Sequence, residues 1–269
     1  MTFSGYDIII EAGQSNAEGS GRGAVKEEYI PSEDILYLVQ DFSLTEGIRN
    51  GVWNIELILT DTPPRVEIAD IRRDEKGEIG DLALSFAAEY KRRGLLAEGR
   101  KLLIVRAGVG GTGFKKKQWG LSDVVYQRML ALIDHALALE GENNIVAFLW
   151  HQGEHDAFEG NTPDVFEGQL KALFTDVKQR YSVPEIPIVA GDFVREWKGE
   201  NIGICAPIIE KIKKVVSEEG GEFVEASDLP SNNEMLSNGD NIHFCRESLR
   251  ILGVRYFEAF LKIVTRKKV

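Results

Sequence analysis

Two short stretches of the sequence contain the residue types that nucleophilic acyl transfer requires. Ser15 stands in "AGQSNAEGSG", directly after the apolar run "YDIII" at residues 6–10, and His243 stands in "NGDNIHF", with Asp240 three residues before it. A serine becomes a strong nucleophile when a histidine takes its proton, and a carboxylate on the other ring nitrogen fixes the tautomer of that histidine. The three-residue spacing lets Asp240 fold back onto His243. A capping serine and an unrelated surface histidine are the alternatives.

The glycine-rich stretch at residues 12–23 is also a candidate for a phosphate-binding loop. A P-loop reads G-x-x-x-x-G-K-[ST], and a dinucleotide fingerprint reads G-x-G-x-x-G. After Gly13 the next glycine is Gly19, and Ser20 follows it instead of a lysine, so neither pattern is present. A strand-to-helix turn that presents Ser15 fits better, because Gly13 lets the turn tighten and a helix N-terminus favours negative charge.

Two further stretches place polar groups after apolar runs. In "RAGVGGTGFKKKQW" (106–119), Gly110 or Gly111 can bring a backbone N–H to a ligand. In "LWHQGEHDA" (149–157), the side-chain amide of Gln152 can point at an oxyanion. This stretch also reads H-x-x-E-H, an inverted zinc-protease pattern, but zinc chemistry of that kind needs both histidines on one helix. Because the stretch follows a strand and has a glycine in its middle, we expect a loop and no metal.

In combination, four blocks of the sequence resemble those of the SGNH-hydrolase superfamily: "GQSNAEG", "GVGGTGF…W", "WHQGEHDA" and "DNIHF". They are most similar to the sialate O-acetylesterase-like branch, which includes the carbohydrate esterase family 6 acetyl xylan esterases. The blocks span residues 13–243, and their combination and order are specific although each block alone is not. The resemblance implies a three-layer α/β/α sandwich with a flavodoxin-like parallel sheet, and metal-free removal of acetyl groups from sugars.

The same resemblance implies roles for individual residues. The catalytic triad would be Ser15 as nucleophile, His243 as base and Asp240 as its orienting acid. The oxyanion donors would be the Ser15 N–H, a glycine N–H from Gly110 or Gly111, and the Gln152 side chain. The superfamily more usually has an asparagine where Gln152 stands, and the longer side chain is typical of this branch.

Three other residues of the blocks have two or more interpretations. Asn16 either ties the serine turn to a neighbouring loop or is a plain turn residue. Glu154 braces the Ser15 loop, shares the acidic role, or is an ordinary loop carboxylate. Trp119 forms either a platform for a sugar ring or part of the core.

The composition restricts the class of protein and its partners. The chain has 269 residues, of which 43% are hydrophobic and 28% charged, and this favours one globular α/β domain over residues 1–269. Its net charge of −11 argues against nucleic acid or an anionic membrane as partner, since both need basic patches. The two cysteines, Cys205 and Cys245, indicate neither a disulfide framework nor a zinc ribbon. With no secretory signal in view, we expect a cytoplasmic protein. The resemblance implies that it needs no cofactor and acts on a small acetylated sugar or oligosaccharide.

Short β-branched runs alternate with longer periodic segments, which predicts a parallel sheet with helices on both faces. The predicted strands are 6–10, 34–39, 101–105, 144–150, 186–192 and 222–226. The predicted helices are 80–94, 121–141, 162–181, 203–220 and 246–267. Ligands bind beyond the carboxyl ends of such strands, so the four blocks should meet at one edge of the sheet. Residues 40–80, rich in Gly, Pro and charge, predict a loop-rich excursion beside the site, with a hairpin around "NIELILT".

Two rival hypotheses stay open on the sequence alone. A lipase-like or aryl esterase would use the same triad on another acyl group. A nucleotide- or sugar-binding module would hold a ligand in its glycine loops without chemistry. A burst of acetate with a covalent adduct at Ser15 separates an enzyme from a binding module.

Overall fold

The computed structural model describes residues 2–49, 52–60 and 62–266, and it contains a central seven-stranded sheet. The strands of this sheet are β1 (Gly5–Gly13), β2 (Ile35–Val39), β5 (Arg65–Ile68), β8 (Arg100–Arg106), β9 (Asn144–His151), β10 (Ile188–Gly191) and β11 (Glu222–Val224). Their spatial order is β11-β10-β9-β1-β8-β2-β5. All neighbours are parallel except β2 and β5, which pair antiparallel. The predicted parallel sheet is therefore confirmed, with one antiparallel strand at its edge.

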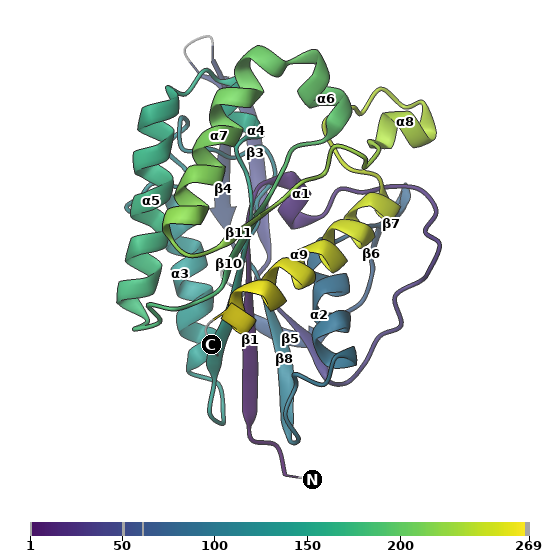
Figure 1. The fold of residues 1–269 in the computed structure, drawn as a ribbon, viewed down its shortest axis with the longest axis vertical. Helices are drawn as coiled ribbons and strands as arrows, with labels where there is room; N and C mark the ends of the chain where they lie inside the picture. Colours follow the sequence, from purple (N-terminus) through teal and green to yellow (C-terminus); the bar gives the residue numbers. More distant parts are fainter. Residues whose placement is uncertain (1, 50–51, 61, 267–269) are drawn as a thin grey trace.

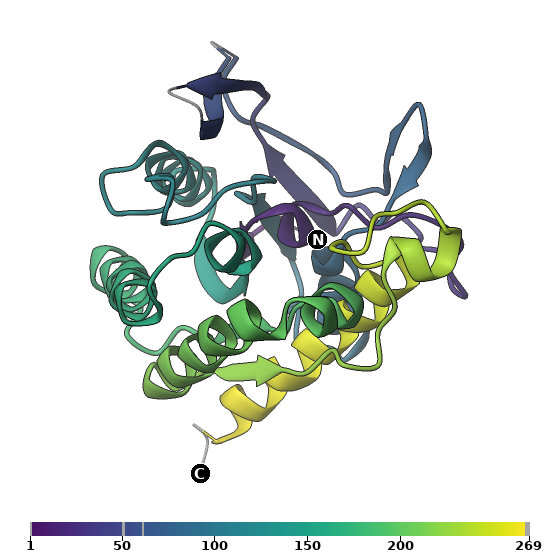
Figure 2. The ribbon, with the colours of Figure 1, turned by 90° about the horizontal axis from the view of Figure 1, so that it is seen from above.

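Helices cover both faces of the sheet (Figures 1 and 2). One face carries α2 (Leu82–Arg92) and α9 (Arg246–Arg266), and the other carries α3 (Val124–Leu137), α5 (Pro163–Arg180) and α7 (Ile202–Glu218). Four short helices lie near the carboxyl ends of the strands: α1 (Ser15–Glu18), α4 (Glu154–Phe158), α6 (Arg195–Glu200) and α8 (Asn232–Leu236). This is the predicted three-layer α/β/α sandwich. No helix in the described part of the chain is long and apolar enough to cross a membrane.

Each predicted helix and strand is present, with ends shifted by a few residues. The last helix begins at Arg246 as predicted and runs to Arg266, and the final residue of its predicted range, 267, lies outside the described residues. Strand β1 shows why its apolar run is continuous. Ile8 and Ile10 pack on the α3–α5–α7 side, whereas Ile9 packs on the α2–α9 side, and all three are fully buried. A strand covered on both faces has no polar side to expose.

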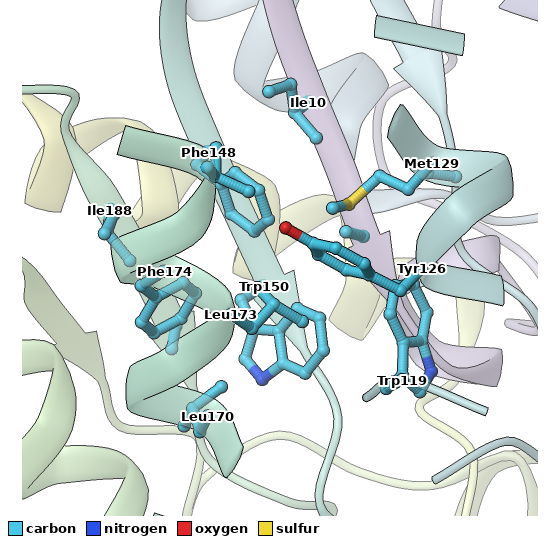
Figure 3. Close-up of a cluster of buried hydrophobic side chains, with 14 of the residues drawn as sticks. Ile10, Trp119, Tyr126, Met129, Phe148, Trp150, Leu170, Leu173, Phe174 and Ile188 are labelled. Atoms are coloured by element: carbon cyan, nitrogen blue, oxygen red, sulfur yellow. The ribbon is translucent and has the colours of Figure 1, made fainter. Parts of the chain in front are cut away.

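Trp119 belongs to the core on the α3 side and not to a sugar platform (Figure 3). Its ring is fully buried and packs edge-on against Trp150, with 5.1 Å between the ring centroids. A side chain that is closed off from solvent cannot stack on a substrate. Of the two interpretations from the sequence, core packing is confirmed.

Residues 40–80 contain more regular structure than expected. The predicted hairpin is present as β3 (Phe42–Arg49) and β4 (Val52–Leu59), and β6 (Arg72–Asp74) pairs with β7 (Gly77–Ile79) in a second hairpin. Both hairpins project from the sandwich in Figure 2. Between them, β5 adds the sheet edge with the charged sequence "RVEI", in which every residue is exposed. Charged residues are typical of an edge strand, because they block pairing with other chains, and here they resembled a loop signal.

Candidate active site

Ser15 is the first residue of α1, immediately beyond the carboxyl end of the central strand β1. The exit from the strand needs Gly13, which has φ 133° and whose Cα lies so close to β9 that a Cβ would be 2.1 Å from the His151 carbonyl oxygen. The Gln14 N–H donates to the same carbonyl at 2.9 Å. The tight strand-to-helix turn predicted from the glycine is therefore present, with Ser15 at a helix start.

His243 and Asp240 lie in the loop before α9 and reach Ser15 in series. The distance between His243 Nε2 and Ser15 Oγ is 2.9 Å, and that between His243 Nδ1 and Asp240 Oδ1 is 2.8 Å. Ser15 is 8% exposed, so the hydroxyl lies in a largely dry environment. The structure thus brings together the three residues that the sequence singled out, in hydrogen-bond contact and in the expected order.

Asp240 is held as a carboxylate by a partner that the sequence did not reveal. Burial raises the pKa of Asp240, but the hydrogen bonds from His243 and Asn232 outweigh it, and the net pKa lies below the ordinary value. Asn232 is fully buried and donates from Nδ2 to Asp240 Oδ2 at 2.8 Å. It follows Ser231, which caps α8 with Glu234 in a capping box, and this S-x-x-E pattern was the only local signal.

Asn16 and Glu154 connect the serine turn to two other segments. Asn16 Nδ2 donates to Glu154 Oε1 at 2.9 Å and to the Ile242 carbonyl at 3.2 Å, and Asn16 Oδ1 accepts from the Phe244 N–H at 3.1 Å. Glu154 is fully buried, and its second neighbour is the His151 ring, 3.5 Å from Nε2. Burial raises the pKa of Glu154, but the contacts with His151 and Asn16 outweigh this effect, and the net pKa lies below the ordinary value. These contacts fit the bracing interpretation of Glu154.

The glycine loop, residues 107–113, follows β8 and passes beside Ser15. A Cβ built on Gly110 would lie 3.5 Å from Ser15 Cβ. The loop is anchored to the core through Thr112, whose hydroxyl donates to the Val109 carbonyl at 2.6 Å and accepts from Trp119 Nε1 at 2.9 Å. Trp119 therefore serves the site by holding this loop in place.

Gln152 reaches the same loop from the end of β9. It is 1% exposed, and its Nε2 donates to Asp156 Oδ2 at 2.5 Å and to the Thr112 carbonyl at 3.5 Å. Asp156 also accepts from the N–H groups of Phe114 and Lys115, at 2.9 and 2.8 Å. Asp156 stands inside the block "WHQGEHDA", but the sequence analysis assigned it no role, and its two backbone donors lie 42 and 41 positions away. The oxyanion role of Gln152 stays a prediction.

The stretch "HQGEH" is not the loop that we expected. His151 is the last residue of β9, and α4 begins at Glu154. Gly153, with φ 138°, makes the sharp change of direction that lets a helix start three residues after the strand. His151 Nδ1 contacts the Tyr256 hydroxyl at 2.9 Å. Among the described residues, no group of three or more His, Cys, Asp or Glu side chains is arranged to hold a metal ion.

Two arginines that sequence reasoning missed fix the C-terminal end of α1. Arg72 from β6 donates to the carbonyls of Glu18 and Gly19, and Arg106 from β8 donates to the Glu18 carbonyl. Guanidinium groups favour a helix C-terminus because the helix dipole is negative there. The excursion 40–80 thus contributes a residue to the support of the serine turn.

The sequence and the fold are similar to those of known proteins. The family described as carbohydrate esterase, sialic acid-specific acetylesterase, matches residues 5–262. A protein of Escherichia coli K12 named probable 9-O-acetyl-N-acetylneuraminic acid deacetylase is 25% identical over 226 residues, which are 72% of this chain and 68% of that one.

Two solved structures have a similar fold. The crystal structure of NanS has a TM-score of 0.73 at 18% identity, and the match covers 99% of both chains. The structure of an Arabidopsis thaliana protein has a TM-score of 0.69 at 22% identity, and the match covers 95% of this chain and 98% of that one. At these identities the likeness concerns the fold alone.

Proposed function

The chain belongs to the carbohydrate esterase family of sialic acid-specific acetylesterases, and on this premise we propose that it removes O-acetyl groups from a sugar as a serine esterase. The contact of 2.9 Å between Ser15 Oγ and His243 Nε2 carries the proposal. A hydroxyl bonded to a ring nitrogen, with a carboxylate on the other nitrogen, is the arrangement that activates a serine nucleophile. Asp240 supplies that carboxylate at 2.8 Å.

In the first half of the reaction, Ser15 Oγ attacks the acetyl carbonyl carbon while His243 Nε2 takes the hydroxyl proton. The imidazolium that forms is stabilised by the ionised Asp240. Collapse of the tetrahedral intermediate breaks the bond to the sugar oxygen, which receives the proton from His243. In the second half, His243 deprotonates a water that attacks the acetyl-enzyme, and acetate leaves as Ser15 recovers its proton.

The oxyanion of each tetrahedral intermediate needs donors in fixed positions. We assign the Ser15 N–H at the start of α1, a glycine N–H from the loop 107–113, and the Gln152 amide. The amide is positioned by its short bond to Asp156, while its contact with the Thr112 carbonyl, at 3.5 Å, is long enough to be exchanged for a ligand.

For the sugar, we place O-acetylated sialic acid first. Both the description of the family and the name of the Escherichia coli relative refer to it. Acetylated xylan, which the motif resemblance suggested equally, is the second member of the substrate panel, and an aryl acetate is the third because it reports on the triad without sugar recognition.

The test combines acetate release from this panel with labelling by a fluorophosphonate. We expect a covalent adduct at Ser15, and we expect Ser15→Ala to lower acetate release by about 10⁴-fold or more, while Ser217→Ala, at an exposed serine of α7, leaves it unchanged. Hydrolysis of the aryl acetate alone would indicate the broader esterase. Neither turnover nor adduct, with a sugar still bound, would indicate the binding module.

A further inference from the structure

The glycine loop offers the N–H groups of Gly110 and Gly111 to the oxyanion, and its other hydrogen bonds decide between them. Five N–H groups of the loop have protein acceptors. Ala107 and Gly108 donate to the Glu11 carbonyl, Val109 to the Gly13 carbonyl, and Gly113 to Gln118 Oε1. The Gly110 N–H donates to Glu18 Oε2 at 2.7 Å. Within the described chain, the N–H groups of Gly111 and Thr112 are the two in this loop that have no acceptor.

Of these two groups, Thr112 is the less suitable donor. Its side chain is tied to the Val109 carbonyl and to Trp119, and the residue is 1% exposed. Gly111 is half-buried and has φ 69°, a left-handed conformation that turns the backbone sharply next to Gly110. We propose that Glu18 is a positioning residue of the active site, which holds the Gly110 N–H and leaves the Gly111 N–H as the backbone donor to the oxyanion. This inference rests on the proposed esterase function.

Glu18 is well placed to set the distance between nucleophile and loop. It is the last residue of the four-residue helix that begins with Ser15, so one rigid turn carries both side chains. A Cβ built on Gly110 would lie 3.1 Å from Glu18 Oε2 and 3.5 Å from Ser15 Cβ. The bond from Gly110 to Glu18 spans 92 residues of sequence and is thus a direct link between the nucleophile turn and the donor loop. A shift of about 1 Å in such a link is enough to cost about 10²-fold in rate.

Three arginines provide the positive surroundings that keep Glu18 in this position. Arg72, Arg106 and Arg128 are each attracted by the Glu18 carboxylate. Arg128 is 3% exposed, and its own acceptors are backbone carbonyls at 3.3–3.4 Å. Burial lowers the pKa of Arg128 to about 10, and Glu18 opposes that change. Glu18, Arg106 and Arg128 also line, among others, a small cavity of about 50 Å³.

The experiment compares Glu18→Ala with Glu18→Gln, whose amide oxygen can still accept from the Gly110 N–H. We expect Glu18→Ala to lower kcat on an aryl acetate by about 10- to 100-fold with KM changed less than about threefold, and Glu18→Gln to keep at least about a third of kcat. Affinity for a boronic acid, which forms a tetrahedral adduct with serine, should fall with kcat/KM. The pH profile should not move, because Glu18 transfers no proton. Glu33→Ala, at an exposed carboxylate, is the matched control.

Two results would overturn the inference. A Glu18→Ala variant as fast as the parent or faster would mean that the carboxylate masks the Gly110 donor. Equal losses in Glu18→Ala and Glu18→Gln would mean that the charge, and not the hydrogen bond, is what matters. If circular dichroism shows Glu18→Ala to be unfolded, Glu18→Asp replaces it, with the same expected loss because its carboxylate is one methylene too short. A Ser15→Ala variant that retains activity would instead count against the proposed function itself.

Discussion

The side chain of Asn16 hydrogen-bonds the backbone on both sides of His243, at the Ile242 carbonyl and at the Phe244 N–H. Because Asn16 directly follows Ser15, a single residue fixes the serine turn and the histidine loop relative to each other. Glu154 holds the same amide at 2.9 Å. Ser15 and His243, the proposed nucleophile and base, are therefore aligned by a buried polar network and not only by their mutual contact.

The Asn16→Ala variant tests this network. We expect kcat to fall by about 10- to 100-fold, because the distance from Ser15 to His243 is no longer fixed. We also expect a loss of stability of about 1–3 kcal/mol for each buried group left unpaired, measured by urea unfolding. Asn144→Ala, at an exposed position on β9, serves as the control. An unchanged kcat would show that the Ser15–His243 contact aligns itself.

The two carboxylates of the site should differ in their effects on turnover. We expect Asp240→Asn to lower kcat on the order of 10⁴-fold, because asparagine can hold the wrong tautomer and cannot stabilise the imidazolium. Glu154→Gln should cost about 10- to 100-fold, since glutamine keeps a bond to Asn16 and Glu154 acts through another residue. Both purified variants are compared at one pH, after circular dichroism. A larger loss in Glu154→Gln would remove Asp240 from the triad.

Chelation should leave activity intact. The proposed chemistry uses Ser15, His243 and Asp240. In the metal-like pattern H-x-x-E-H, His151 instead forms a hydrogen bond with the Tyr256 hydroxyl. The protein is treated with EDTA, desalted, and assayed with an aryl acetate against an untreated sample. Loss of activity that zinc restores would contradict this expectation and would require a different assignment for the His151–His155 stretch.

The pKa of Glu154 predicts how stability depends on pH. Its pKa is lower in the folded protein than in the unfolded chain, so the unfolded chain binds more protons in the intervening range. The stability that this carboxylate contributes is fully present at pH 7 and is lost as pH falls from about 5 through the folded-state pKa.

The measurement compares the free energy of unfolding of the parent with that of Glu154→Gln. We expect the difference between the two proteins to shrink between pH 7 and pH 4, because glutamine does not titrate. For the exposed control Glu33→Gln, the difference should stay nearly constant. A gap that widens in acid would mean that Glu154 is protonated in the folded protein.

Local signals explain most of what the sequence predicted. The apolar run of β1 and the helix periodicities are properties of neighbouring residues. The contact between Asp240 and His243 also joins residues only three positions apart in the sequence. The rule that ligands bind beyond the carboxyl ends of parallel strands then placed the four blocks together. The core position of Trp119 was one of two interpretations, because burial depends on which helix covers that face.

What the sequence did not predict depends on contacts between different elements of the fold. Asn232 reaches Asp240 from α8, and Glu18 reaches Gly110 across 92 residues. Asp156 accepts hydrogen bonds from two backbone N–H groups in the loop that follows β8. The capping pattern around Asn232 and the blocks that contain Glu18 and Asp156 do not indicate which residues these side chains contact, so the fold is needed to assign their roles. The start of α4 at Glu154 was missed because the glycine before it indicated a loop.

Ser15 and His243 are 228 residues apart in the sequence, and His243, the proposed base, lies just before α9. During synthesis, a ribosome would have added the 228 residues from Ser15 to His243 before the proposed base could meet the proposed nucleophile, so we expect the nascent protein to stay inactive until α9 packs against α2. The same order applies in reverse under stress. Detachment of α9 would release His243 and stop turnover while the strands around β1 were still paired, so that loss of activity would be an early sign of unfolding.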